Sequence, residues 1–309
     1  VLQKLVGLKK GLESTNTTIS RTGIVLCTAC VSIHNYLSFN MNSRKSIEET
    51  DSKVEWRTVD LFSISSSKKA LEGVHYALYL VHSMQPSTRL DQSNFEDTDL
   101  LLADNFSRAA ETCKLKHIVY VGGILPKDDL NISKHLKSRF EVEQVLGSRS
   151  SPLTTLRAGI IIGPGGSSFR IVQKLVKNLP VMACPQWTKS KNQPIDVFDI
   201  LSLLKQCMGN PKTYGKNIEI GGDQVMSYMD LLIMTSKQMN KKRWIFSIPF
   251  FTVGLSKWWV SIFTGTNIDF VSPLVESLKH RMTPNTDSNH LYKIQFLCVW
   301  FISNLPEQC

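Results

Sequence analysis

Short apolar runs alternate along the chain with longer segments in which apolar residues recur every three or four positions. The short runs, bounded by turn residues, predict β-strands, and the longer spacing predicts amphipathic α-helices. Strands are predicted at 54–61, 75–81, 117–121, 156–163, near 194 and at 216–222. Helices are predicted at 65–73, 94–114, 132–146, 167–179, within 194–208 and from about 227 onward.

Strands that alternate with helices predict βαβ units and therefore a parallel sheet with right-handed crossovers. The expected fold class is α/β, with a doubly wound, Rossmann-like parallel sheet and a smaller C-terminal substrate portion. We expect a divergent segment over 1–50, a core over 51–165, a looser substrate-side portion over 166–290 and a divergent tail over 291–309. Two interpretations of 1–50 are open: a degenerate first βα unit, or a segment unrelated to the fold.

The clearest candidate for a ligand-binding turn closes the apolar strand that begins at Leu156. This strand carries Arg157 near its start and ends in Gly163-Pro164-Gly165. Ligands of open α/β sheets bind beyond the carboxyl ends of such strands, so this turn is expected beside a cofactor or substrate. A plain strand and turn is the alternative.

The chain is basic, with a formal net charge of +10, but its Lys and Arg residues are dispersed. No long basic run is interleaved with aromatic residues, so we do not expect a nucleic-acid partner. A solvated basic surface, or one suited to a phosphate-bearing ligand, explains the charge better.

The seven cysteines are scattered, and Cys27 and Cys30 form a lone CxxC without a second pair or a His set. We therefore expect no metal site and a reducing compartment, either the cytoplasm or an organelle matrix. The most apolar stretch, Trp244–Phe263, is interrupted by Pro and Gly and by Lys257. It predicts a partly buried or interfacial helix pair rather than a membrane span, which leaves peripheral membrane contact open.

A series of short motifs follows the predicted strands and helices in order. They are Val59-Asp60-Leu61, Tyr79–Met84, Asn105-Phe106, Ile118–Gly123, Ser133–Glu143, Leu156–Gly165, Leu179–Met182, Gln193–Ile195 with Asp199, Leu255-Ser256 with Trp259, and Pro273–Leu278. This ordered set resembles the extended, atypical branch of the short-chain dehydrogenase/reductase superfamily, and most of all its NmrA-like, YbjT-type group of NAD(P)-binding proteins.

The resemblance covers about residues 51–282 and implies that 51–165 is a dinucleotide-binding core. It also implies hydride transfer to a small carbonyl or quinone-like substrate. The alternative is a non-catalytic NADP(H)-binding redox sensor, or an assembly or interaction protein, because a fold alone does not choose among these.

The N-terminal cofactor motif of the family is largely missing. Thr22-Gly23 resembles its remnant, but the further glycines that let a backbone approach a pyrophosphate are absent. If that alignment holds, Arg44 falls near the end of the second strand, where it would favour the 2′-phosphate of NADP over NAD. Without the glycines, binding is expected to be weak.

Further cofactor contacts are implied along the core. Asp60 matches the residue that contacts the adenine amino group, with a turn-forming Asp as the alternative. His82 and Ser83 follow a strand end over the expected cleft and would act mainly through their backbone. Arg157 and Gly159 lie on the strand that leads to the Gly-Pro-Gly turn. The alternative role of Arg157 is a structural ion pair.

The catalytic residues of the superfamily are only partly matched. Its reductases use a Ser at a strand end, with a Tyr and a Lys four residues apart on the next helix. Here Gly122 occupies the Ser position, and His135 and Arg139 occupy the Tyr and Lys positions. The spacing places both side chains on one helical face, where His135 is suited to donate a proton and Arg139 to bind an anion. A structural role on the helix surface is the alternative for both. Asn105, in the middle of a predicted helix beside the sheet, is either a catalytic residue or a satisfied structural amide.

Overall fold

The computed structural model describes residues 23–27, 59–82, 95–126, 132–163, 167–248, 253–265 and 268–285. The chain forms two compact units that alternate along the sequence. The first unit comprises Val1–Val121, Glu141–Thr155 and Leu203–Lys216, and the second comprises Gly122–Phe140, Leu156–Ser202 and Asn217–Cys309. The contiguous boundaries expected from the sequence stay a prediction.

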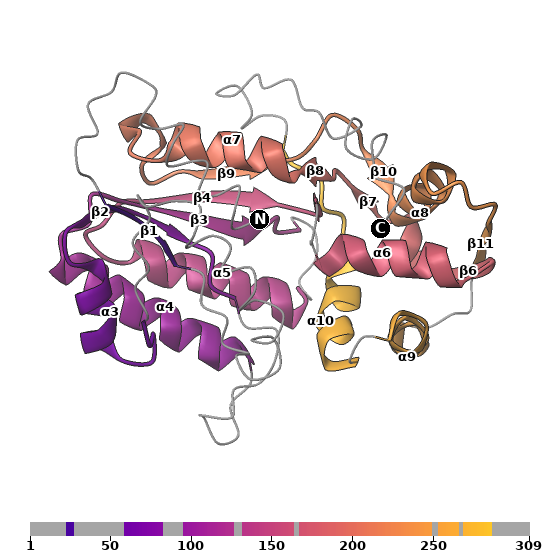
Figure 1. The fold of residues 1–309 in the computed structure, drawn as a ribbon, viewed down its shortest axis with the longest axis horizontal. Helices are drawn as coiled ribbons and strands as arrows, with labels where there is room; N and C mark the ends of the chain where they lie inside the picture. Colours follow the sequence, from indigo (N-terminus) through magenta and orange to yellow (C-terminus); the bar gives the residue numbers. More distant parts are fainter. Residues whose placement is uncertain are drawn as a thin grey trace, which may run out of the picture. The chain divides into compact units, whose positions relative to one another are not determined.

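Five strands form the main sheet, in the order β1-β2-β3-β4-β9 (Figure 1). The pairs β1–β2 and β2–β3 are parallel, as the βαβ pattern predicted. The α/β, Rossmann-like fold class is therefore confirmed. The strands are β1 (Gly23–Cys27), β2 (Val74–Tyr79), β3 (His117–Gly123), β4 (Leu153–Ala158) and β9 (Asn217–Ile220).

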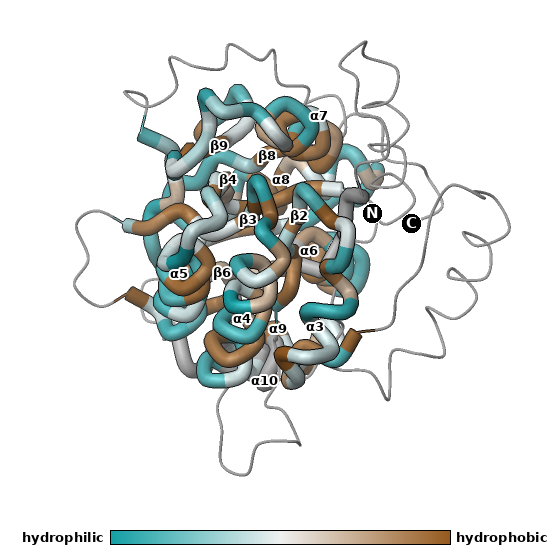
Figure 2. The backbone as a smooth tube through the Cα atoms, turned by 90° about the vertical axis from the view of Figure 1, so that its left-hand side faces the viewer, coloured by the Kyte–Doolittle hydropathy of each residue, from teal (hydrophilic) through white to brown (hydrophobic). Residues whose placement is uncertain are grey.

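In the first unit, apolar side chains of helices pack against β2 and β3 in one continuous core. The helices that contribute are α3 (Ile64–Leu71), α4 (Phe95–Thr112) and the second half of α5 (Lys134–Gly147). Along α4, Leu102, Phe106 and Ala110 are spaced by four residues and are fully buried. Leu101, predicted on that face, is exposed instead. Apolar and polar positions alternate along this helix (Figure 2).

The second unit combines short strand pairs with four helices. The helices are α6 (Ser167–Asn178), α8 (Tyr228–Gln238), α9 (Val253–Thr264) and α10 (Ile268–Leu278). The strand pairs are β6 (Val181–Pro185) with β11 (Trp244–Ile248), β5 (Ile161–Ile162) with β8 (Ile195–Asp196), and β7 (Lys191–Asn192) with β10 (Met226–Ser227). Helix α7 (Val197–Cys207) begins directly after β8.

Three expectations from the sequence need correction. The apolar strand from Leu156 is divided into the end of β4 and the separate strand β5, which pairs with β8. The stretch Trp244–Phe263 forms strand β11 and helix α9, not a helix pair. Residues 59–61 form no strand, and 54–58 lie outside the described residues. An apolar run indicates burial, but it does not reveal where the chain changes its hydrogen-bonding partner.

Candidate functional site

The parallel β1–β2 pair defines the candidate cofactor edge in the first unit. Cys27 pairs with Tyr79, so the carboxyl ends of both strands meet at one edge. In doubly wound folds this is the edge at which ligands bind. The pairing supports the interpretation that 1–50 contains a first strand of the fold. Thr22, Arg44 and Ser83 lie outside the described residues, so their roles stay predictions.

Gly23 lies at the start of the first described strand. It opens β1 and pairs with Val74, the first residue of β2. At about 3.3 Å per residue, the four steps to Cys27 separate it from the carboxyl edge by about 13 Å. The residues that follow Cys27 lie outside the described part of the chain, so the cofactor contact of Gly23 stays a prediction.

An ion pair between His82 and the buried Asp99 lies just after β2 at this edge. His82 Nδ1 lies 2.8 Å from Oδ2 of Asp99, which comes from the second turn of α4 and is buried. A carboxylate only accepts hydrogen bonds, so the imidazole donates from Nδ1, and the carboxylate fixes the ring orientation. His82 was predicted as a backbone contact, and Asp99 was missed. An Asp on the apolar side of a predicted helix was the signal that could have revealed it.

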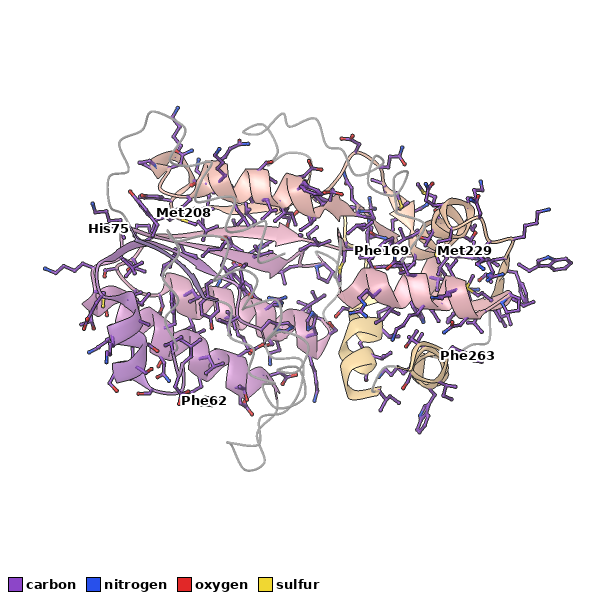
Figure 3. All side chains as sticks on the ribbon, in the orientation of Figure 1. Phe62, His75, Phe169, Met208, Met229 and Phe263 are labelled. Carbon is purple, nitrogen blue, oxygen red and sulfur yellow. The ribbon has the colours of Figure 1, made fainter. Side chains whose placement is uncertain are left out.

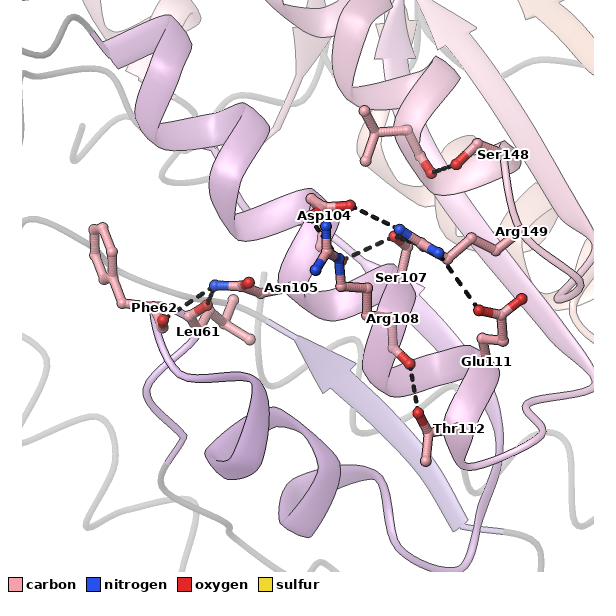
Figure 4. Close-up of polar contacts among 11 residues, drawn as sticks. Leu61, Phe62, Asp104, Asn105, Ser107, Arg108, Glu111, Thr112, Ser148 and Arg149 are labelled. Atoms are coloured by element: carbon pink, nitrogen blue, oxygen red, sulfur yellow. Dashed lines mark hydrogen bonds and ion pairs between the residues drawn. The ribbon is translucent and has the colours of Figure 1, made fainter.

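Asp60 forms a turn before α3. Its Oδ1 accepts a hydrogen bond from Phe62 N at 3.1 Å, and its own N–H donates to Ser66 Oγ. Asn105 of α4 holds the same turn, because its Nδ2 donates to the carbonyls of Leu61 and Phe62 (Figure 4). Asn105 is thus a structural amide. Asp60 has the turn role that was its alternative, and its adenine contact stays a prediction.

In the second unit, the end of β3 lies against the first turns of α5. A Cβ at Gly123 would lie 2.9 Å from Cδ2 of Leu136. Ser133 accepts a hydrogen bond from Leu136 N, and its hydroxyl lies 2.9 Å from that of Ser277 on α10. Gly122 is buried in β3. The strand end and the helix start therefore form one packed element.

His135 and Arg139 lie on this anchored part of α5 and are both half-buried. Their four-residue spacing places them on one face of the helix, as predicted. Gly122 carries no hydroxyl, and His and Arg stand at the two positions that the resemblance matches to Tyr and Lys. Their catalytic roles stay a prediction.

Arg157 and Gly159 lie at the end of β4 and just beyond it. Arg157 is half-buried. A Cβ at Gly159 would lie 3.4 Å from both Cβ and O of Met282, whose N–H donates to Lys191 O. Gly159 thus permits a close approach of Met282, and its cofactor contact stays a prediction. A Cβ at Gly163 would lie only 2.5 Å from Cγ1 of Val197 at the start of α7.

The second unit also contains an apolar cavity of about 80 Å³. Tyr228 and Trp187 line it and pack edge to face, with ring centroids 6.1 Å apart. The Tyr228 hydroxyl has no hydrogen-bond partner within the described part of the chain, and burial raises its pKa. Such a cavity has room for a small apolar group with one hydrogen-bond acceptor.

Two negative observations apply to the described ranges alone. No group of three or more His, Cys, Asp or Glu side chains there is placed to hold a metal ion. None of the helices found there is both long and apolar enough to cross a lipid bilayer.

No protein-family model matches the chain. Over 107 residues it is 26% identical to the auxiliary protein GraX of Staphylococcus aureus, a match that spans 34% of this chain and 30% of GraX. The triphenylmethane reductase of Citrobacter sp. is similar in structure, with a TM-score of 0.65, 15% identity, and coverage of 99% of this chain and 96% of that one.

Two further solved structures are similar. One is an NADPH-dependent quinone oxidoreductase of Escherichia coli, with a TM-score of 0.57, 14% identity, and coverage of 94% of this chain and 89% of that one. The other is a nucleoside-diphosphate-sugar epimerase of Staphylococcus aureus, with a TM-score of 0.63, 14% identity, and coverage of 92% and 100%. The reductase and the oxidoreductase have both been solved with NADP(H) bound. The chain therefore has the fold of the NmrA-like, atypical short-chain dehydrogenase/reductase proteins that bind NAD(P).

Proposed function

We propose that this protein binds NADP(H) at the carboxyl edge of β1 and β2. The observation that carries the proposal is the buried His82–Asp99 pair, held at 2.8 Å directly after β2. A fixed imidazole at a ligand-binding edge can donate or accept a hydrogen bond without reorganisation on binding. The solved relatives that hold NADP(H) support the choice of ligand.

The finer proposal is reduction of a small carbonyl or quinone-like substrate. When bound, the dinucleotide would supply a hydride. His135 donates the accompanying proton, and the guanidinium of Arg139 holds an anionic group of the dinucleotide. The apolar cavity beside Trp187 and Tyr228 is suited to a small ring, in agreement with an uncharged, ring-containing substrate.

Calorimetric titration of the purified chain tests the cofactor proposal. Because the glycines of the family turn are missing, we expect an NADPH dissociation constant on the order of a millimolar, about −4 kcal/mol. NADPH should bind more tightly than NADH if Arg44 contacts the 2′-phosphate. Asp99→Asn should weaken binding, whereas Asp104→Asn, on the same helix, should not.

Two results would contradict this proposal. One is a chain that is folded by circular dichroism and binds no NADPH at millimolar concentration. The other is equal weakening by Asp99→Asn and by Asp104→Asn, which would remove the role of the His82–Asp99 pair. A preference for NADH would remove the role given to Arg44 alone.

A second candidate is a non-catalytic NADP(H)-binding sensor or assembly protein. The absence of a hydroxyl at Gly122 favours it, and the curated relative GraX is itself described as an auxiliary protein. Single-turnover oxidation of NADPH with a small quinone separates the two candidates. Binding without oxidation would support the sensor.

A further inference from the structure

Large apolar side chains are exposed on one part of the second unit. Trp244 is 76% exposed, Ile262 67% and Trp258 61%. Val181, Phe246 and Phe263 are exposed in the same elements, β6, β11 and α9. Phe263 is labelled on α9 in Figure 3. Several large exposed apolar side chains in neighbouring elements are typical of a site of interaction.

The C-terminal end of α6 joins these elements into one surface. Asn178 Nδ2 donates to Phe263 O at 2.8 Å, and Lys174 Nζ donates to Thr264 O at 2.7 Å, which ties α6 to α9. Trp244 N donates to Pro180 O, and Trp244 pairs with Val181, which brings β11 and β6 to the same end. We call this area the α6–β11–α9 surface.

The local geometry turns apolar side chains outward in both elements. In β11, Trp244 and Phe246 are two residues apart and therefore lie on one face of the strand. In α9, Trp258 and Ile262 are four residues apart and share a face, whereas Val260 is buried in the core of the unit. The exposure of these residues is thus a regular feature of both elements.

The charge of the segments that form this surface is basic, although Glu276 of α10 forms an ion pair with Lys257 of α9. Neither 170–195 nor 231–268 contains an Asp or a Glu, while the two segments together contain ten Lys and Arg residues. Arg243 donates to the carbonyls of Val176 and Lys177, so it compensates the negative end of the α6 dipole. Lys177, Lys241 and Lys242 are exposed, and no ion pair holds them in the part of the chain that is described.

We propose that the α6–β11–α9 surface docks on an anionic lipid bilayer. Trp and Phe side chains surrounded by Lys are suited to the lipid interface, where rings enter the headgroup region and cations meet lipid phosphates and carboxylates. The charge also argues against a second copy of this chain as the occupant, because two such surfaces would bring cations together. This docking does not depend on the cofactor proposal.

Vesicle co-sedimentation of the purified full chain tests the docking. Vesicles of phosphatidylcholine mixed with phosphatidylserine should bind the protein in a salt-sensitive manner, and vesicles of phosphatidylcholine alone should not. Lys241→Glu with Lys242→Glu should weaken binding by about tenfold or more, because each basic residue near an anionic surface contributes a factor of about five. Trp244→Ser with Ile262→Ser should also weaken vesicle binding, because the indole ring and the apolar side chain are no longer present to enter the lipid interface.

Two control variants match these changes elsewhere on the molecule. Lys212→Glu with Lys216→Glu makes the same charge change at other exposed positions, and Val225→Ser removes another exposed apolar side chain. Both controls should bind vesicles as the parent does. The proposal is overturned if the anionic vesicles do not bind the chain, or if the controls lose as much affinity as the test variants. Self-association that Trp244→Ser abolishes, without vesicle binding, would assign the surface to a second copy instead.

Discussion

One buried polar side chain from each unit shows a contrast in hydrogen bonding. In the first unit, His117 is fully buried and both ring nitrogens are engaged: Nε2 lies 2.8 Å from Thr154 Oγ1, and Gly209 N–H donates to Nδ1 at 3.1 Å. Thr154 donates in turn to Thr213 O. In the second unit, the buried Tyr228 hydroxyl has no partner in the described chain and borders a cavity. The buried His117 side chain is therefore satisfied by the fold itself, whereas the Tyr228 hydroxyl can still accept or donate a hydrogen bond in the cavity.

Surface contacts show the same difference. In the first unit, Arg149 joins Asp104, Ser107 and Glu111 of α4 in one polar network (Figure 4). In the second unit, Trp244 and Ile262 expose apolar side chains. A satisfied hydrogen-bond network stabilises one conformation of the protein. Unsatisfied polar groups and exposed apolar groups become favourably paired or buried only when a ligand or another surface binds. The contrast is therefore between a satisfied polar network on α4 and an exposed apolar surface on β11 and α9.

The largest expected effect is on the stability of the first unit. Phe106 is fully buried and packs against Tyr79, with ring centroids 4.9 Å apart. Phe106→Ala should lower the free energy of unfolding by about 3–5 kcal/mol, measured by urea denaturation. Phe246→Ala, at an exposed position of the second unit, should change it by less than about 1 kcal/mol. Equal losses would break the distinction between the units.

A smaller effect is expected from pH. Burial lowers the pKa of His117 from 6.5 to about 4. Between these values the unfolded chain takes up a proton that the folded chain excludes, so stability should fall as pH falls from 6.5 to 4, by about 3 kcal/mol. His117→Gln should remove this part of the slope, whereas His75→Gln should keep it. An unchanged slope in His117→Gln would show that other groups carry the pH dependence.

The expected effect on chemistry tests the second unit. His135→Phe should lower any NADPH-dependent reductase rate by about a hundredfold, the usual scale for loss of a general acid. Cofactor affinity, measured by calorimetry, should change little. Lys137→Ala is the control on the same helix and should keep the parent rate. A parent-like rate for His135→Phe at saturating NADPH would leave His135 with a structural role.

The smallest expected effect concerns Tyr228. Removing a buried hydroxyl that lacks a partner relieves its desolvation cost, so Tyr228→Phe should raise the free energy of unfolding by about 1 kcal/mol. Tyr214→Phe, at a half-buried position, should give no such gain. Thermal and urea unfolding would measure both. A loss of stability in Tyr228→Phe would mean that water in the cavity already satisfies the hydroxyl.

The order of strands and helices was largely predictable, because hydrophobic periodicity reports local burial. The candidate site was predictable only in part. His135 and Arg139 share a helical face because of their spacing alone, but the partner of His82 is Asp99 of α4, 17 residues further along the chain. Pairings between distant segments depend on the topology, which a local pattern does not contain.

The sequence by itself determined the α/β class, the one-signed charge of 170–195 and 231–268, and the absence of the family's glycine-rich turn. Only the tertiary structure decided that Gly159 accommodates Met282, that Asp99 holds His82, and that Trp244 lies on a surface joined to Phe263 through α6. The physical reason is that secondary-structure propensity and hydrophobic periodicity depend on residues that are neighbours in the chain. Each of these contacts forms only after separate elements have packed together.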